Sequence, residues 1–468
     1  MQLRSVTYIL LLCVAYHITG CRLLHKTRNP NLPATTIAAP DKLPEANTAS
    51  TGIPDSNNSI SQMVQKYLFA QQQLANAHVG IAIFHPKTNR YWYQFQSNKY
   101  FTPASNTKIF TCYAALQYLG DSLVALQYTP GSTVHAQATG DPTFLHPLFA
   151  YQPLYAFLQK NTNIKLSNTN WQCEALGKGW AWDDYRNDFM PERSILPVYG
   201  NVANLQIVNK QLRCIPSLPL AAADSSATFL PSEMHLYKFY RQLYQNQLLW
   251  QKNNKPFTAT TLPFITSLAS SVAFLQDTLP NTRFSITSSS GTYSHRLHSQ
   301  PTDTLLKIMM HQSDNFLAEQ TLLMISQQAL GYMNDDAIIK HLLNSTFSGL
   351  PQATKWIDGS GLSRYNLTTP ENFIWVLQQQ LNNISWKRIT SIYPSGNSGT
   401  LKNYYTPFAK NIYAKTGTLN NQVSLCGYLI TEKKETLLFS ILVNNHVGSA
   451  TAIRRAIETL LTTIIKTY

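Results

Sequence analysis

The sequence predicts an α+β fold: one antiparallel five-stranded sheet, flanked by helices and built from both ends of the chain, with a β-rich domain inserted between them. Two observations lead to this prediction. A helical pattern and a hairpin stand near the N-terminus, and three strand patterns followed by a helix close the C-terminus. Short strand patterns with turn signals fill the middle. With 468 residues, of which 44% are hydrophobic, the chain has ample core material, which excludes disorder of the whole chain.

The first segment of the domain that contains this sheet is expected over residues 59–128. Ser59–Ala75 has helical periodicity, and two strand patterns, His78–His85 and Arg90–Gln96, follow as a hairpin. A helix is expected to open near Ser105 and to end at Gly120.

The inserted domain is expected over residues 129–291, where short strand patterns alternate with turn signals. One Tyr/Leu-rich stretch, Met234–Trp250, is interpreted as helical. The second segment of the domain that contains the five-stranded sheet is expected over residues 292–468. Helices are expected from Thr302 and over Asn315 to about Ala329, strands over Asn411–Thr418, Val423–Thr431 and Thr436–Val443, and a last helix over Ser449–Lys466.

The first 58 residues indicate export. Arg4 precedes an apolar segment, Val6–Ala15, of the length found in a secretory signal, so residues 1–20 are interpreted as a signal peptide. Ile18-Thr19-Gly20-Cys21 resembles a bacterial lipobox, which predicts lipidation at Cys21; an ordinary signal peptide cut nearby is the alternative. Residues 21–58 have the composition of a flexible tether. We therefore expect a periplasmic protein held to a bacterial membrane by a lipid anchor.

Four cysteines follow the tether. In an oxidising compartment Cys173 and Cys214 form the plausible pair, whereas Cys112 and Cys426 lie in apolar helix and strand patterns and are interpreted as small buried residues. Four cysteines allow three pairings, so the pattern leaves the connectivity open.

The charge balance restricts the partners. Lys+Arg number 37 against 23 Asp+Glu, a net charge of +14, but no basic run exceeds two residues and no zinc-finger spacing occurs. We therefore expect no nucleic acid as a partner and interpret the charge as attraction to an anionic wall or membrane surface. Beyond the N-terminus no apolar run is long enough for a multi-span membrane protein.

Ser105 and Lys108 stand three residues apart, which places their side chains on one face of a helix. A serine hydroxyl becomes a nucleophile only when an adjacent base removes its proton, and a lysine serves as that base only when its pKa is lowered. Ser105 is the only serine in the chain with a lysine at this spacing. Taken alone, the pattern more often marks a helix start with a solvent-facing lysine.

Two further motifs follow in the chain. Ser313-Asp314-Asn315 lies between two expected helices, and its ordinary interpretation is a turn with a helix N-cap. Lys415-Thr416-Gly417-Thr418 ends an expected strand, where it offers a cation and hydroxyls for a carboxylate and a glycine beside which a substrate backbone can approach. Its ordinary interpretation is a strand end with a turn glycine.

The order Ser-x-x-Lys, Ser-x-Asn, Lys-Thr-Gly is a stronger signal than any one motif. In this order and on these elements the sequence resembles the penicillin-recognising serine acyl-transferases, and the long gap between the first two motifs resembles the D-Ala-D-Ala carboxypeptidase/endopeptidase family of low-molecular-mass class C penicillin-binding proteins. Further matches are Gly140-Asp141-Pro142-Thr143, Gly179–Asp184, Asp358–Arg364 and Ser398–Leu401. The resemblance covers about residues 60–466 and implies a transpeptidase/β-lactamase-like catalytic domain.

The resemblance also implies the roles of the site residues. Ser105 is the nucleophile and Lys108 its base, whose pKa Lys415 is expected to lower by repulsion, and Ser313 relays the proton to the leaving amine. Asn315 binds the substrate amide. Lys415, Thr416 and Thr418 hold the terminal carboxylate of the peptide stem, beside Gly417, and Asp358 and Arg364 support the site. Peptidoglycan stem peptides are the implied substrates and β-lactams the covalent inhibitors, without cofactor or metal.

Two other functions remain as alternatives. A serine β-lactamase shares these motifs, but the class with Ser-Asp-Asn adds a Glu-x-x-Leu-Asn segment that is absent between Asn315 and Lys415. A catalytically silent wall-binding lipoprotein is expected to have lost a motif residue, and all are present. Metal hydrolysis is weaker, because His295-Arg296-Leu297-His298 fits a strand or loop better than a helical zinc motif.

Overall fold

The computed structural model describes residues 59–468, apart from residues 210, 224–234, 254–255 and 257–258. The expected signal peptide (1–20), the tether (21–58) and the lipidation site Cys21 lie outside the described residues. Among the described residues, no helix is both long enough and apolar enough to span a bilayer.

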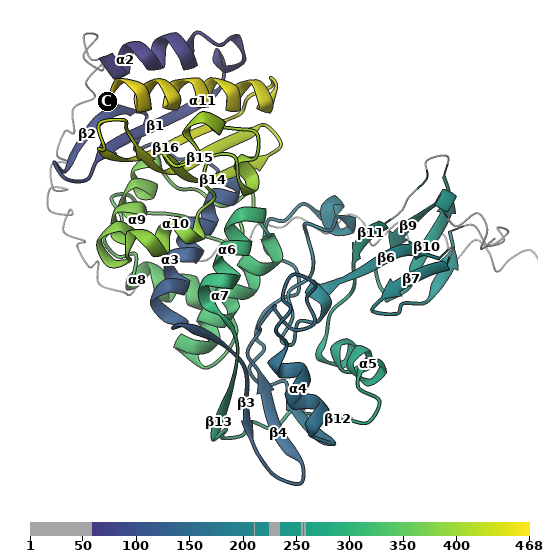
Figure 1. Cartoon of the computed structure of the whole chain (residues 1–468). Helices are drawn as coiled ribbons and strands as arrows, with labels where there is room; N and C mark the ends of the chain where they lie inside the picture. Colours follow the sequence, from purple (N-terminus) through teal and green to yellow (C-terminus); the bar gives the residue numbers. More distant parts are fainter. Residues whose placement is uncertain (1–58, 210, 224–234, 254–255, 257–258) are drawn as a thin grey trace, which may run out of the picture. The chain divides into compact units, whose positions relative to one another are not determined.

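Both ends of the described chain contribute to one antiparallel five-stranded sheet, in the order β14-β15-β16-β1-β2 (Figure 1). Strand β1 pairs with β16, more than 340 residues away in the sequence, so that Ile81 lies opposite Ile441. The expected sheet is thereby confirmed, and β14 is an edge strand. The strands are β1 His78–His85, β2 Arg90–Phe95, β14 Ile412–Leu419, β15 Gln422–Ile430 and β16 Thr436–Asn444.

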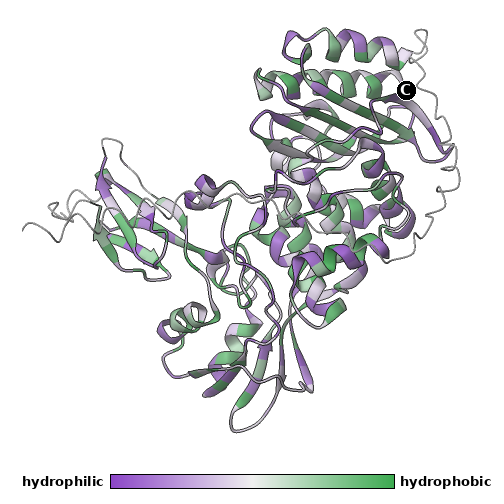
Figure 2. Ribbon diagram, turned by 180° about the vertical axis from the view of Figure 1, so that it is seen from behind, coloured by the Kyte–Doolittle hydropathy of each residue, from purple (hydrophilic) through white to green (hydrophobic). Residues whose placement is uncertain are grey.

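Helices cover both faces of this sheet (Figure 1). Its inner strands are apolar along their length, as Figure 2 shows, because both of their faces are buried. Helix α11 turns Ile453, Ile457 and Leu460 toward one face, and all three are buried. The elements on this side are α2 Ser59–Val64, η1 Gln65–Phe69, η2 Gln72–Leu74 and α11 Ala450–Thr467; on the other side lie α3 Lys108–Tyr118, α9 Pro370–Asn383 and α10 Trp386–Ile392.

A helical layer packs beyond α3, and here the sequence predicted two of the three helices. Helix α6 (Thr302–Gln312) buries Leu305, Leu306, Met309 and Met310, as expected. Ser313 in the left-handed region (φ 57°) ends it, and the Asp314 carboxylate caps α7 (Asn315–Leu330) at once. This tight connection holds the second motif. Helix α8, Asp335–Asn344, follows.

The middle of the chain is rich in β structure, as predicted, and forms three sheets. The first has five strands in the order β12-β5-β4-β3-β13, and two three-stranded sheets have the orders β11-β6-β7 and β8-β10-β9. Because β3 and β13 lie partly or wholly outside residues 129–291, the limits of the inserted domain stay a proposal. The elements are β3 Ser122–Thr129, β4 Val134–Ala138, α4 Pro153–Lys160, β5 Asn163–Ser167, η4 Trp182–Arg186, η5 Tyr199–Asn201, β6 Val202–Val208, β7 Gln211–Ile215, β8 Leu220–Ala222, β9 Tyr237–Arg241, β10 Leu248–Lys252, β11 Ala259–Pro263, α5 Leu268–Thr278, β12 Arg283–Thr287 and β13 His295–Pro301.

The helix predicted over Met234–Trp250 is wrong, because this stretch contains strand β9 and the first residues of β10, which pair with each other in antiparallel orientation. Tyr237, Phe239 and Arg241 are buried while the residues between them are more exposed, which is the period of a strand. The aromatic and aliphatic residues of this stretch suit either structure, and the pairing with β10 decides between them. The prediction that His295–His298 lies in a strand or loop is confirmed.

The four described cysteines are all unpaired. Cys112 and Cys426 are buried, as predicted. The expected Cys173–Cys214 pair is wrong: the Cys214 thiol donates to the Pro216 carbonyl at 3.2 Å, whereas Cys173 lies among charged groups beside Asp335. The two thiols therefore have separate environments.

Candidate active site

The first motif lies at the junction of a short helical turn and a helix. Ser105 belongs to η3 (Ala104–Thr107), and Lys108 begins α3 directly after it. Lys108 Nζ lies 3.0 Å from Ser105 Oγ. Ala104, just before the serine, is in the left-handed region with φ 51°, a conformation that costs a non-glycine residue about 1 kcal/mol or more. The backbone is thus bent so that the serine and the lysine meet.

Lys108 is fully buried (0% exposed). Besides Ser105, its Nζ donates to Asn315 Oδ1 at 2.6 Å and to the Ser360 carbonyl at 2.8 Å. Burial lowers the pKa of Lys108 to about 8, against the attraction of Asp314, Asp358 and Glu319, which raises it. The predicted direction of this pKa is therefore confirmed, but its cause is burial and not the expected repulsion from Lys415.

The second and third motifs meet in the same place. Lys415 Nζ on β14 donates to Ser313 Oγ at 2.7 Å and to the Thr416 carbonyl at 2.7 Å. Lys415 is also fully buried (0% exposed). Burial lowers the pKa of Lys415 well below its usual value, and repulsion from Lys108 adds a smaller effect in the same direction. The structure thus contains two serine–lysine pairs, Ser105 with Lys108 and Ser313 with Lys415.

Asn315 joins the first motif to the second. Its Oδ1 accepts from Lys108, and its Nδ2 donates to the Phe189 carbonyl at 2.9 Å. Phe189 follows η4, so the middle of the chain reaches the edge of the site. In this state the amide group predicted to bind a substrate is held by the protein itself.

Gly417 has a packing role in the structure. A Cβ at this position meets the Ser424 hydroxyl and lies 2.7 Å from the Pro103 carbonyl. The glycine therefore lets the turn that carries Ser105 pack directly on β14. The predicted approach of a substrate backbone beside Gly417 stays a prediction. Thr416 is partly buried and Thr418 exposed at the end of the strand.

Asp358 organises a loop that touches Lys108. Asp358 is fully buried (0% exposed), and its carboxylate accepts from the backbone N–H groups of Gly361 and Ser363 at 2.8 and 2.6 Å. A Cβ on Gly361, whose φ is 86°, overlaps the Ala104 carbonyl, so only glycine fits there. The loop presents the Ser360 carbonyl to Lys108, which agrees with the supporting position predicted for Asp358. Arg364 is exposed, and its backbone N–H donates to the Gly179 carbonyl at 3.2 Å.

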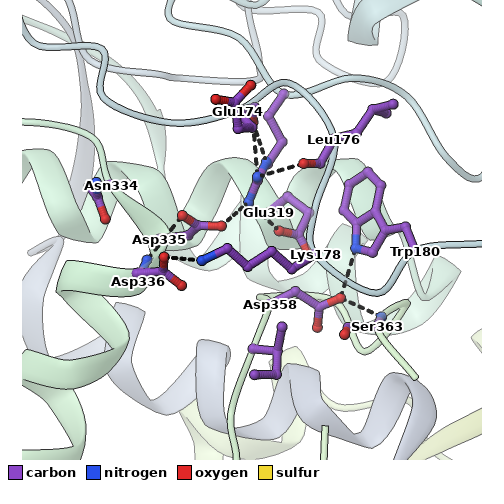
Figure 3. A network of polar contacts seen from close by, with 12 residues as sticks. Glu174, Leu176, Lys178, Trp180, Glu319, Asn334, Asp335, Asp336, Asp358 and Ser363 are labelled. Carbon is purple, nitrogen blue, oxygen red and sulfur yellow. Dashed lines mark hydrogen bonds and ion pairs between the residues drawn. The ribbon is translucent and has the colours of Figure 1, made fainter. Parts of the chain in front are cut away.

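A buried ionic network continues from this loop (Figure 3). Glu319 on α7 accepts from the Ser360 N–H at 2.8 Å and lies 3.5 Å from Arg193 Nη1, which also donates to Asp335 at 2.7 Å. Trp180 Nε1 donates to Asp358 at 3.0 Å. Burial and repulsion from Asp358 raise the pKa of Glu319 to about 7, although Arg193 opposes this. The network thus links residues near position 190 to the peptide that holds Lys108.

The sequence signals for these residues differ. The eight residues predicted to form the catalytic and substrate-binding site lie in one cluster. The Asp358–Ser363 segment could also be recognised as a motif. Glu319 and Arg193 were missed. A charged residue in a largely apolar helix such as α7 is the one signal that pointed to Glu319, and nothing local pointed to Arg193.

The comparisons with known proteins identify the family and the fold. A sequence model described as the D-Ala-D-Ala carboxypeptidase 3 (S13) family matches residues 60–229 and 283–464. The D-alanyl-D-alanine carboxypeptidase DacB of Haemophilus influenzae is 28% identical over 158 residues, 32% of this chain and 33% of that protein. The penicillin-sensitive carboxypeptidase A of Dictyostelium discoideum is 30% identical over 120 residues, 24% of this chain and 23% of that protein. The chain thus spans at most about a third of these relatives.

A solved structure resembles the whole fold. The crystal structure of penicillin-binding protein 4 (dacB) from Haemophilus influenzae matches with a TM-score of 0.67 and 20% identity, over 87% of this chain and 99% of that one. This likeness confirms the predicted transpeptidase-like α+β fold. Because the family model covers most of the sequence and the three motifs converge in the structure, the chain belongs to the D-Ala-D-Ala carboxypeptidase 3 (S13) family.

Proposed function

We propose that this protein is a serine D-Ala-D-Ala carboxypeptidase or endopeptidase that cleaves peptidoglycan stem peptides through an acyl-enzyme and is acylated by β-lactams. The observation that carries the proposal is the 3.0 Å contact between Ser105 Oγ and the Nζ of a buried lysine whose pKa is lowered to about 8. At pH 7 a base with this pKa is neutral in about one tenth of the molecules, against fewer than one in a thousand for a free lysine.

In the acylation step, neutral Lys108 accepts the proton of Ser105 Oγ as the oxygen attacks the carbonyl carbon of the penultimate D-Ala. A carbon–oxygen bond forms and the carbon–nitrogen bond to the terminal residue breaks. Ser313, beside Lys415, relays this proton from Lys108 to the leaving amine, which leaves Lys108 neutral again. Water then attacks the ester and gives a proton to Lys108, which passes it to Ser105 Oγ as the ester carbon–oxygen bond breaks and the stem peptide leaves with a new carboxylate.

The edge position of β14 supports this substrate. Pro394 and Ser395 cover the outer edge of the strand near Tyr413 and Ala414. In the described residues no strand continues this pairing beside Thr416 to Thr418, so an extended peptide can add here as a further strand. The backbone N–H groups of Ser105 and Thr418 then form the oxyanion hole, worth on the order of 3 kcal/mol per donor. Asn315 binds the substrate amide after releasing Phe189, and Lys415, Thr416 and Thr418 face the carboxylate.

Labelled penicillin tests the proposal. We expect a covalent adduct on Ser105, located by mass spectrometry and absent from Ser105→Ala, and release of D-Ala from a muropeptide pentapeptide. Cleavage of cross-linked dimers, scored separately, distinguishes endopeptidase from carboxypeptidase preference. An adduct elsewhere, or one that persists in Ser105→Ala, contradicts the assignment, and rapid turnover of penicillin indicates a β-lactamase instead.

The place of action is part of the same proposal. A peptidoglycan substrate requires export, which agrees with a signal peptide over residues 1–20 and a periplasmic location. Lipidation of Cys21 is proposed on the lipobox pattern alone. Mass spectrometry of the N-terminal peptide tests it, and a Cys21→Ala variant that stays in the membrane fraction contradicts it.

A further inference from the structure

An arginine on α11 lies beside the end of the Lys-Thr-Gly-Thr segment. Arg454 Nη2 donates to Thr418 Oγ1 at 2.7 Å. We propose that Arg454 is a specificity-determining residue that binds the free carboxylate of the leaving D-Ala together with Thr418. This inference rests on the function proposed above and adds a cation that the three motifs do not contain.

Arg454 carries a positive charge that no nearby carboxylate of the described residues neutralises. In the part of the chain that the structure describes, no carboxylate lies within ion-pair distance of its guanidinium. A guanidinium has five N–H donors, so the bond to Thr418 leaves a pair of donors for a carboxylate. The neighbouring Arg455 is different. It donates to Glu458 at 2.6 Å and to the Asn403 carbonyl at 3.0 Å, and it lies over the ring of Tyr404.

Lys415 is poorly suited to binding the carboxylate of the leaving D-Ala. Its Nζ is fully buried and already donates to Ser313 Oγ and to the Thr416 carbonyl. Burial and the nearby Lys108 lower its pKa well below the usual value, so its positive charge is easily lost. A guanidinium keeps its charge at every physiological pH. The permanent positive charge at this end of β14 therefore comes from Arg454.

Arg454 also lies where a ligand on β14 can reach it. Arg454 is partly exposed, as a residue that meets a ligand must be, and Thr418 beside it is exposed. Arg454 also lines one small cavity together with Thr416 and Ser424, so it lies along the same strand segment as the hydroxyls expected to hold the carboxylate. Helix α11 packs against β15, the strand that pairs with β14, and this packing holds the helix that carries Arg454 beside the strand that carries Thr418.

Benzylpenicillin and its methyl ester, which lacks the carboxylate, separate recognition from structural damage. With the full-length protein we expect Arg454→Gln to lower the second-order rate of acylation by benzylpenicillin on the order of 10- to 100-fold and to change the rate with the ester less than about twofold. Arg454→Lys is expected to recover part of the loss. Arg455→Gln is the matched control on the same helix, and it is expected to leave the ratio of the two rates unchanged.

Each outcome bears on one of the two claims. If Arg454→Gln slows the acid and the ester equally, or slows neither, or if Arg455→Gln changes the ratio as much, Arg454 does not recognise the carboxylate and the inference fails while the proposed function stands. If wild-type protein is not acylated at Ser105 by either compound, the proposed function fails first and removes the basis of the inference.

Discussion

In the proposed mechanism, catalysis depends most on Lys108, because this residue must be an amine and not an ammonium when Ser105 attacks. Its burial favours the neutral form, whereas Asp314, Asp358 and Glu319 favour the charged one. The resulting pKa of about 8 keeps the amine basic enough to take a proton and partly free at neutral pH. The site is thus a compromise between desolvation and three nearby carboxylates.

The pH dependence of acylation follows from this pKa. Because the lowered pKa is about 8, the acylation rate with labelled penicillin should rise about tenfold per pH unit below that value and level off above it. Lys108→Arg should lower the plateau by at least about 100-fold, since a guanidinium stays protonated. Stopped-time labelling from pH 5.5 to 9.5 measures both effects, with Lys307→Arg, an exposed lysine on α6, as the control. A rate independent of pH across this range contradicts the role of Lys108 as base.

At the scale of elements, the site depends on direct packing of η3 against β14. Pro103 and Ala104 lie against Gly417, and the Ser424 hydroxyl donates to the Pro103 carbonyl at 2.9 Å. This contact brings the Ser105–Lys108 pair to the strand that carries Lys415. The sheet and the nucleophile helix are thereby held in one arrangement by residues without any chemical role.

Gly417→Ala tests this packing. The added methyl group meets the Ser424 hydroxyl and the Pro103 carbonyl, so we expect a loss of about 1–3 kcal/mol in the free energy of unfolding. We also expect acylation by labelled penicillin to fall at least about tenfold, because the turn that carries Ser105 must move.

Gly331→Ala provides the control for Gly417→Ala. Gly331 has φ 82° with no atom within 4 Å of an added Cβ, so its substitution should cost about 1 kcal/mol through the backbone alone and leave acylation unchanged. Denaturant unfolding and penicillin labelling measure the two effects. Normal acylation in Gly417→Ala would show that the close packing of η3 on β14 does not determine the position of Ser105.

The elements differed in how well the sequence predicted them, for physical reasons. Strand β16 and helix α11 were predicted to within one or two residues at each end, because each combines a clear period with a turn or cap at its limits. The helix prediction for the stretch from Met234 to Trp250 was wrong, since its apolar and aromatic residues fit a helix about as well as two strands. Only the pairing of β9 with β10, which no local pattern records, decides it.

At the scale of the molecule, the site joins parts of the chain that are far apart in sequence. The three motifs could be predicted because their chemistry is local: a serine and its lysine on one turn, or a lysine at a strand end. Arg193, Glu319 and Arg454 could not, because each matters only through a partner brought close by folding. Glu319 touches the Ser360 peptide, 41 residues away, and Arg454 touches Thr418, 36 residues away.

The network in Figure 3 joins residues that are especially far apart in the sequence. Arg193 comes from the middle of the chain, Glu319 and Asp335 from α7 and α8, and the Ser360 peptide from the loop that holds Lys108. Burial raises the pKa of Asp335, but the ion pair and hydrogen bond with Arg193 outweigh it, so the pKa is lowered. Of the two acidic partners of Arg193, Glu319 is therefore the one that titrates near neutral pH.

Glu319→Gln should shift the pH dependence of acylation toward lower pH. The charged groups around Lys108 are Glu319 on α7, Asp314 at its N-cap, Asp358 in the loop and Lys415 on β14. Ionised Glu319 stabilises the charged form of Lys108 and raises its pKa, so removal of that charge should lower the pKa and release more neutral amine. The glutamine Oε1 can still accept from the Ser360 N–H.

We expect the acylation rate of Glu319→Gln at pH 7.5, where Glu319 in the wild type is largely ionised, to exceed the wild-type rate by up to about twofold when each rate is taken relative to its own plateau. Asp336→Asn is the control, because this substitution also replaces a carboxylate by an amide. Asp336 lies at the exposed edge of the network, where it pairs with Lys178. Its pH dependence should match that of the wild type. A merely structural role for Glu319 lowers the rate equally at every pH. An unshifted profile, or a shift toward higher pH, therefore shows that the network does not set the protonation of the base.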